Sequence, residues 1–91
     1  MFTTVNARYF GQPLAYREST EFPGKIWFVA SLKSSGESHE YLGQIEEHEG
    51  VFHSYAYPTL EAVFEGAQDA LIGEEASLKE AAELFAASDV V

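Results

Sequence analysis

The hydrophobic period of this chain changes once, at Pro58-Thr59, and this change constrains the fold more than any other feature. Before it, apolar residues alternate or gather in short β-rich segments; after it, they recur at helical spacing. We expect four or five strands before the change, from the β-rich segments 3–10, 14–18, 25–33, 40–47 and 51–57. The connections between them are short and contain the residues that favour turns, such as Gly11-Gln12-Pro13 and His48-Glu49-Gly50. Short connections between successive strands favour an antiparallel meander.

Two helices are expected after the change, at about 60–72 and 77–88. The apolar stripe of the first consists of Leu60, Val63, Phe64, Ala67 and Leu71. Thr59 suits its N-cap and Gly73 its C-cap, while Ser77-Leu78-Lys79-Glu80 matches the capping-box pattern at the start of the second. The sequence thus predicts one α+β domain over residues 1–91, with a four- to five-stranded antiparallel sheet and two C-terminal helices on one face.

The charge of the chain is unevenly distributed. Fifteen acidic residues against five basic ones give a formal net charge of −10. Residues 1–33 carry a net +2 and residues 34–91 a net −12. Such a field repels nucleic acid and anionic lipid and attracts basic partners. We therefore expect a basic protein surface as the partner, and neither direct nucleic-acid binding nor a membrane.

The composition also indicates a compartment. The chain has no cysteine, which excludes disulfides and thiolate metal sites and suits a reducing cytoplasm. No apolar run approaches the length of a membrane span, and the N-terminus lacks the pattern of a secretory signal. The expected location is cytoplasmic.

The candidate partner-binding residues are acids and tyrosines. Glu61, Glu65 and Asp69 recur every four residues and would line one flank of the first expected helix. A second group crowds one hairpin end: Glu46, Glu47 and Glu49. Tyr55 and Tyr57 share one face of their strand, and tyrosine is enriched at protein interfaces.

No catalytic motif stands out. Ser54 and His53 are neighbours on a strand and would point to opposite faces. The histidines at 39, 48 and 53 match no metal-ligand spacing, and no glycine-rich nucleotide motif occurs. We expect a non-enzymatic protein without catalytic residues, metal or cofactor. A small metal-dependent or acid–base enzyme, based on the His and Glu content of residues 39–53, is a third hypothesis.

In size, acidity and lack of cysteine, the whole chain resembles the small acidic inhibitors of phages and plasmids, such as anti-CRISPR and DNA-mimic proteins. That resemblance rests on no motif and implies a non-enzymatic inhibitor that docks on a nucleic-acid-binding surface of a defence complex.

The segment 57–62 (YPTLEA) also resembles the sheet-to-helix junction of HicB-type antitoxins, although no DNA-binding module follows it. It implies the alternative of an antitoxin-like or regulatory partner that pairs through a sheet edge or tyrosine-rich face, as a homodimer.

Overall fold

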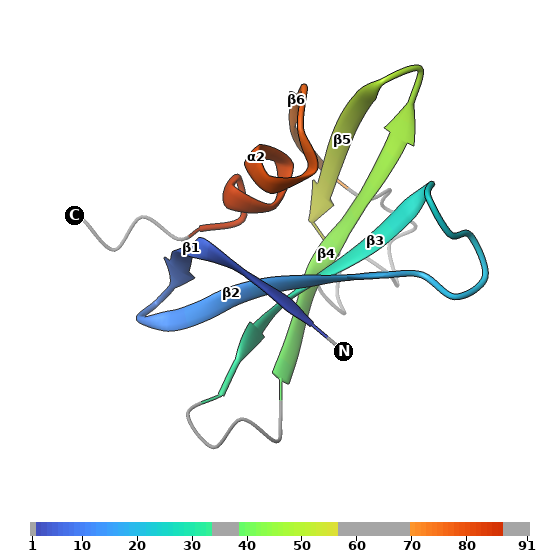
Figure 1. Ribbon diagram of the computed structural model, residues 1–91. Coiled ribbons are helices and arrows are strands. Elements are labelled where there is room, and N and C mark those ends of the chain that lie inside the picture. Colours follow the sequence, from blue (N-terminus) through green and yellow to red (C-terminus); the bar gives the residue numbers. More distant parts are fainter. Residues whose placement is uncertain (1, 34–38, 57–69, 87–91) are drawn as a thin grey trace, which may run out of the picture.

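The computed structural model describes residues 2–33, 39–56 and 70–86, which form one curled antiparallel sheet and a short helix (Figure 1). The strands are β1 (Thr3–Tyr9), β2 (Gln12–Glu18), β3 (Ile26–Leu32), β4 (His39–His48), β5 (Val51–Ala56) and β6 (Ala70–Glu75). They follow one another across the six-stranded sheet in chain order. The helix α2 (Leu78–Glu83) lies against the concave side, which we call the inner face, and contacts both β1 and β6.

The predicted α+β architecture is wrong, because the described structure is nearly all-β. It has six strands instead of four or five, and one short helix instead of two. Residues 70–72 of the first expected helix belong to β6, where Leu71 pairs with Tyr55. Gly73, the expected C-cap, pairs with Ser54. The rest of that helix, from 60 to 69, lies outside the described residues.

The second expected helix is present but shorter than 77–88. Its start is as predicted: the Ser77 hydroxyl oxygen accepts the Glu80 N–H at 3.2 Å and the hydroxyl donates to Glu80 Oε1 at 2.9 Å. After Glu83 the backbone tightens. The Phe85 and Ala86 N–H groups donate to the carbonyls three residues earlier, as is common in the last turn of a helix. Residues 87 and 88 lie outside the described part.

The core lies between the inner face and α2. Its members are Leu14, Trp27, Val29, Ile45, Ala81, Ala82 and Phe85. Two glycines allow the C-terminal segment to approach the sheet closely. A Cβ at Gly43 would lie 2.5 Å from Phe85 Cε1, and one at Gly73 would lie 2.6 Å from Leu84 Cδ1. The helix is therefore seated directly on the backbone of β4 and β6.

Two fully buried serines, Ser31 and Ser54, predict a contrast in stability. Ser54 Oγ donates to the Ala81 carbonyl of α2 at 2.8 Å, whereas Ser31 Oγ has no hydrogen-bond partner in the described part of the chain. Removing a satisfied buried hydroxyl costs about 1–2 kcal/mol, while removing an unsatisfied one is close to neutral. We expect Ser54→Ala to lower the free energy of unfolding by that amount and Ser31→Ala to leave it unchanged or raise it. Urea denaturation of the two variants checks this, and equal losses would contradict it.

Candidate partner-binding site

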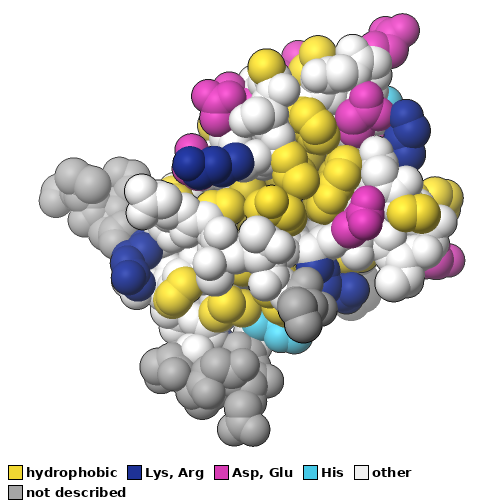
Figure 2. Space-filling model, viewed as in Figure 1, with side chains coloured by type: hydrophobic (Ala, Val, Ile, Leu, Met, Phe, Trp, Pro, Cys, Tyr) yellow, Lys and Arg dark blue, Asp and Glu magenta, His cyan; other side chains and the backbone are white. Residues whose placement is uncertain are grey.

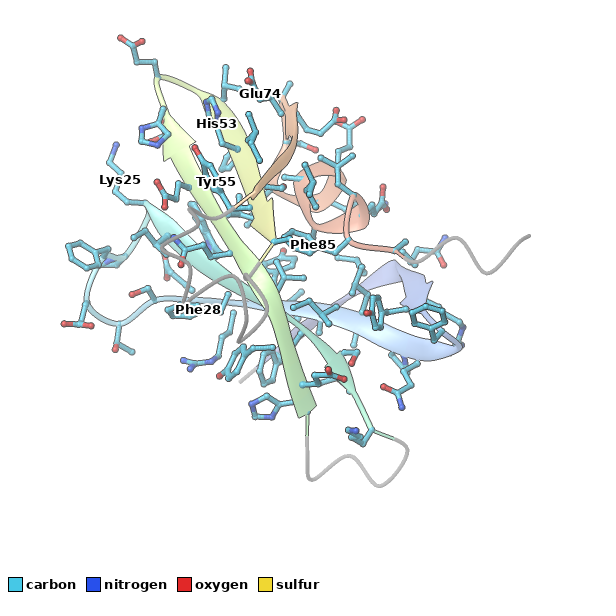
Figure 3. All side chains as sticks on the ribbon, turned by 180° about the vertical axis from the view of Figure 1, so that it is seen from behind. Lys25, Phe28, His53, Tyr55, Glu74 and Phe85 are labelled. Carbon is cyan, nitrogen blue, oxygen red and sulfur yellow. The ribbon has the colours of Figure 1, made fainter. Side chains whose placement is uncertain are left out.

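The sheet turns a second surface, the outer face, away from α2. Strand register places Glu46, His53 and Glu74 in one row across β4, β5 and β6. The adjacent row holds Phe28, Gln44 and Tyr55. Side chains two residues apart on a strand share a face, so both rows lie on the outer face. Figure 3 shows His53, Tyr55 and Glu74 near one another over β5 and β6.

Most described acids gather at one end of the molecule, which we call the acidic end. It holds seven of the ten described carboxylates: Glu46, Glu47, Glu49, Glu74, Glu75, Glu80 and Glu83. Only Lys25 and Lys79 offset them there, whereas the remaining described acids, at 18, 21 and 40, are balanced by Arg8, Arg17 and Lys33. In Figure 2 acidic side chains gather toward the top, where Figure 1 places the β4–β5 hairpin, β6 and α2. The described part of the chain thus carries most of its negative charge at the acidic end.

The β4–β5 turn brings Glu46, Glu47 and Glu49 together, as the sequence predicted. They line a hollow together with Lys25, Ile26 and His48. Their exposure differs, however, because Glu49 is exposed at the turn while the Glu47 side chain is only 19% exposed. Glu47 accepts hydrogen bonds from Lys25 Nζ and from the Gly50 N–H, both at 2.8 Å. Glu47 therefore holds the turn, and Glu46 and Glu49 are better placed to meet a partner.

The bonds to Glu47 predict acid sensitivity. Its hydrogen bonds to Lys25 and to the Gly50 N–H lower the pKa of Glu47 below its ordinary value of 4.5. A lowered folded-state pKa contributes stability that is present above the unfolded pKa and lost as pH falls through the folded value. We expect Glu47→Gln to lose less stability than wild type on acidification from about pH 6 to about pH 3.5. Urea titrations at both pH values measure this, with Glu49→Gln as the control that should follow wild type.

The histidines of the acidic end face carboxylates and each other. The His48 and His53 ring centroids are 5.1 Å apart. His48 Nε2 lies 3.2 Å from Glu46 Oε1, and His53 Nδ1 lies 3.8 Å from Glu74 Oε2. Within residues 2–33, 39–56 and 70–86, no three His, Cys, Asp or Glu side chains are placed to hold a metal ion. Ser54 is buried on the inner face, away from His53, and is bonded to α2.

Of the remaining predicted partner-binding residues, one lies in the described part of the chain and the others do not. Tyr55 is half-buried on the outer face and stacks on His53 at a centroid distance of 6.5 Å, so it adjoins the acidic end. The others, Glu61, Glu65, Asp69 and Tyr57, lie outside the described residues.

Sequence reasoning missed a second cluster on the outer face, built around Arg17. The rings around its guanidinium belong to Phe2, Phe28 and Tyr41, with centroids at 5.9, 5.2 and 5.5 Å from Cζ. His39 packs against Phe2 and Tyr41 at 4.8 and 4.7 Å. The outward position of Phe28 follows from strand alternation, but no sequence signal joins it to residues of β2 and β4.

No helix in the part of the chain that the structure describes has the length and apolar character to cross a membrane. Comparisons with protein-family models, with curated proteins and with solved structures gave no match.

Proposed function

We propose that this protein is a non-enzymatic, cytoplasmic binding module whose acidic end docks on a basic protein surface. The observation that carries the proposal is the gathering of seven described carboxylates on the β4–β5 hairpin, β6 and α2, against Lys79 of α2 and Lys25, which pairs with Glu47. Complementary charge steers association and suppresses wrong partners. The most specific form of the proposal is an inhibitor that occupies the nucleic-acid-binding surface of a defence complex, in the manner of the anti-CRISPR and DNA-mimic proteins it resembles.

Two exposed acids of this end are the best contacts to test. Glu49 projects from the hairpin turn, and Glu74 is 53% exposed on β6. Neither supports the hairpin as Glu47 does, so their neutralisation should leave the fold intact. The proposal assigns them to lysine and arginine side chains of the partner, with Glu46 and Tyr55 at the margin of the contact.

The test compares two double variants of equal net charge. Glu49→Gln/Glu74→Gln removes two charges from the acidic end, and Glu21→Gln/Glu40→Gln removes two exposed charges elsewhere. Proteins captured from the host lysate by wild type should also be captured by the second variant, lost with the first, and displaced by single-stranded DNA. With a purified partner, we expect the first variant to bind at least about tenfold more weakly at low salt, or about 1.4 kcal/mol.

Equal weakening by both double variants would mean that only total charge matters, and would overturn the proposed site. A partner retained in the presence of excess DNA would overturn the inhibitor form of the proposal while leaving the basic-surface contact. The three predicted helix acids, Glu61, Glu65 and Asp69, are reversed in a separate variant, which tests their assignment independently.

A second candidate is the antitoxin-like or regulatory homodimer. The observation that favours it is β6, which pairs only with β5 among the described strands and carries Leu71 and Ile72 at 49% and 40% exposure. Strands at the edge of a sheet offer backbone groups to another chain. Sedimentation at high micromolar concentration tests it: a strictly monomeric wild type, indistinguishable from Ile72→Lys, would remove this candidate.

A further inference from the structure

The Arg17 cluster has the features of a preorganised anion site. Arg17 Nε and Nη2 both donate to the Tyr41 hydroxyl oxygen, at 2.9 and 2.6 Å, so the guanidinium is fixed in orientation. The rings of Phe2, Phe28 and Tyr41 lie within 6 Å of its Cζ atom, and these cation–π contacts hold the half-buried guanidinium further in place. A cation that is already ordered loses little side-chain entropy when a ligand binds.

The bonding capacity of this guanidinium is only partly used. Arginine has five N–H donors, and Tyr41 engages two of them. Among the described residues the other three, including the end formed by both Nη atoms, have no side-chain partner. That end can donate two parallel hydrogen bonds to one carboxylate. No carboxylate of the described residues lies within 4.0 Å of Arg17. Glu40 is the neighbour of Tyr41 in β4, but adjacent strand residues point to opposite faces.

We propose that the Arg17 cluster binds a single carboxylate that lies beside an aromatic ring in a peptide segment of a partner protein. The carboxylate would accept the two N–H groups at the Nη end, and the ligand's ring would pack on Phe2, Phe28 or Tyr41, of which Tyr41 is 36% exposed. Arginine and large aromatic residues dominate the contacts that matter most at protein interfaces. The site is separate from the acidic end and stands whether or not the proposed function holds.

The outer face favours a peptide over single-stranded nucleic acid. Aromatic rings with an arginine can also stack bases, but that mode needs a basic groove along the phosphate chain. Here the same face carries Glu46 and Glu74. The register shift that leaves Leu42 as an extra residue in β4 puts Tyr41 and Glu46 on one face, five residues or about 16 Å apart. A run of phosphates extending from Arg17 toward that row would meet like charge, whereas one carboxylate would not.

The experiment is a titration with two peptides that differ in one group. Acetyl-Ser-Phe-Glu-Phe-Ser-amide and its glutamine counterpart are added to the ¹⁵N-labelled full chain, and the Arg17 Nε–Hε and backbone signals are followed. We expect the glutamate peptide to bind at least about tenfold more tightly and to shift signals of β2, β3 and β4 around Arg17. A short oligothymidine is titrated in parallel.

Variants separate a binding role from a structural one. Arg17→Gln should lower affinity for the glutamate peptide at least about tenfold. Arg17→Lys should lower it less, because the positive charge remains although the two parallel N–H donors of the guanidinium are lost. Arg8→Gln, which removes an exposed charge from β1, should leave affinity within about twofold of wild type. The near-ultraviolet circular dichroism of each variant confirms that the fold is retained.

Three results would overturn the proposal. The first is equal affinity for the glutamate and glutamine peptides, including no binding of either. The second is affinity that survives Arg17→Gln in a folded variant. The third is tighter binding of oligothymidine than of the glutamate peptide, which would assign the cluster to nucleic acid instead.

Discussion

A Gly43→Ala variant is expected to lose at least about 3 kcal/mol of its free energy of unfolding, which is a large part of the stability of a domain this small. The added Cβ would overlap the backbone carbonyl oxygen of Tyr55 on β5 and would lie 2.5 and 2.9 Å from two ring atoms of Phe85. The Tyr55 carbonyl cannot withdraw without disturbing the pairing of β4 with β5. The new methyl therefore disturbs the sheet and the seat of α2 together. Urea denaturation followed by Trp27 fluorescence and by circular dichroism measures the loss.

Gly73→Ala is the matched control. Its added Cβ would approach Leu84 Cδ1 at 2.6 Å, which is the far end of a flexible side chain, and the next contacts are at 3.5 and 3.6 Å. Leu84 can rotate away, so we expect a loss below about 1.5 kcal/mol, and less still when Leu84 is also changed to alanine. If both glycine variants lost equal stability, the close approach of the β5 backbone would not be the cause.

Phe85→Ala is expected to lower the free energy of unfolding by about 3–5 kcal/mol, as truncation of a buried phenylalanine usually does. Phe85 is 7% exposed and packs on the Gly43 side of β4, next to Ile45 and the alanines of α2. Its loss leaves a cavity where the C-terminal segment meets the sheet. Because this contact seats α2, we also expect hydrogen exchange of α2 amides to accelerate more than that of β3.

Phe22→Ala is the control for the loss of a phenylalanine ring. Phe22 is 55% exposed in the turn before β3, and its backbone bond to Ser19 Oγ does not need the ring. We expect a change within about 0.5 kcal/mol. A Phe85→Ala variant as stable as Phe22→Ala would show that α2 contributes little to the core.

The first five strands were within reach of the sequence because their signals are local. Residues 26–32 alternate between Trp27, Val29 and Ser31 on one face and Phe28 and Ala30 on the other, and the structure buries both faces at the centre of β3. The capping pattern at Ser77 was equally local and gave the start of α2. In each of these segments, the residues of the segment itself carry the signal: the alternation of apolar residues for a strand, or the capping pattern for the start of a helix.

The strand β6 could not be predicted because its signal is ambiguous. Ala70-Leu71-Ile72 is a short apolar run that continues the helical spacing ahead of it, and such runs do not distinguish strand from helix. Pairing with β5 makes this segment a strand. The pairing includes a register irregularity between Ser54 and Tyr55, which the sequence pattern does not predict. Glycine is common at helix ends, so Gly73 suggests a C-cap, whereas in the structure it leaves room for the Leu84 side chain.

Of the two candidate sites, the sequence predicted the one whose residues are neighbours in the chain and missed the one whose residues are far apart in it. Glu46, Glu47 and Glu49 are neighbours in the chain, so a predicted hairpin was enough to bring them together. Arg17 and Tyr41 are 24 residues apart, and their contact depends on the registers of β2, β3 and β4. One-residue register differences move side chains to the other face, which places such a cluster beyond single-sequence reasoning.

The position of α2 also bears on how the chain folds as it is synthesised. The helix is made after all of the described strands, yet Ala81 and Ala82 belong to the core and α2 contacts β1, which is the first of those strands. Until α2 leaves the ribosome, the inner face of the emerging strands lacks the cover that α2 gives it in the described structure. Contacts between such distant parts slow folding, and exposed strands invite aggregation. Closure of the described core therefore waits until α2 has been made, and the strands are most prone to aggregation before that point.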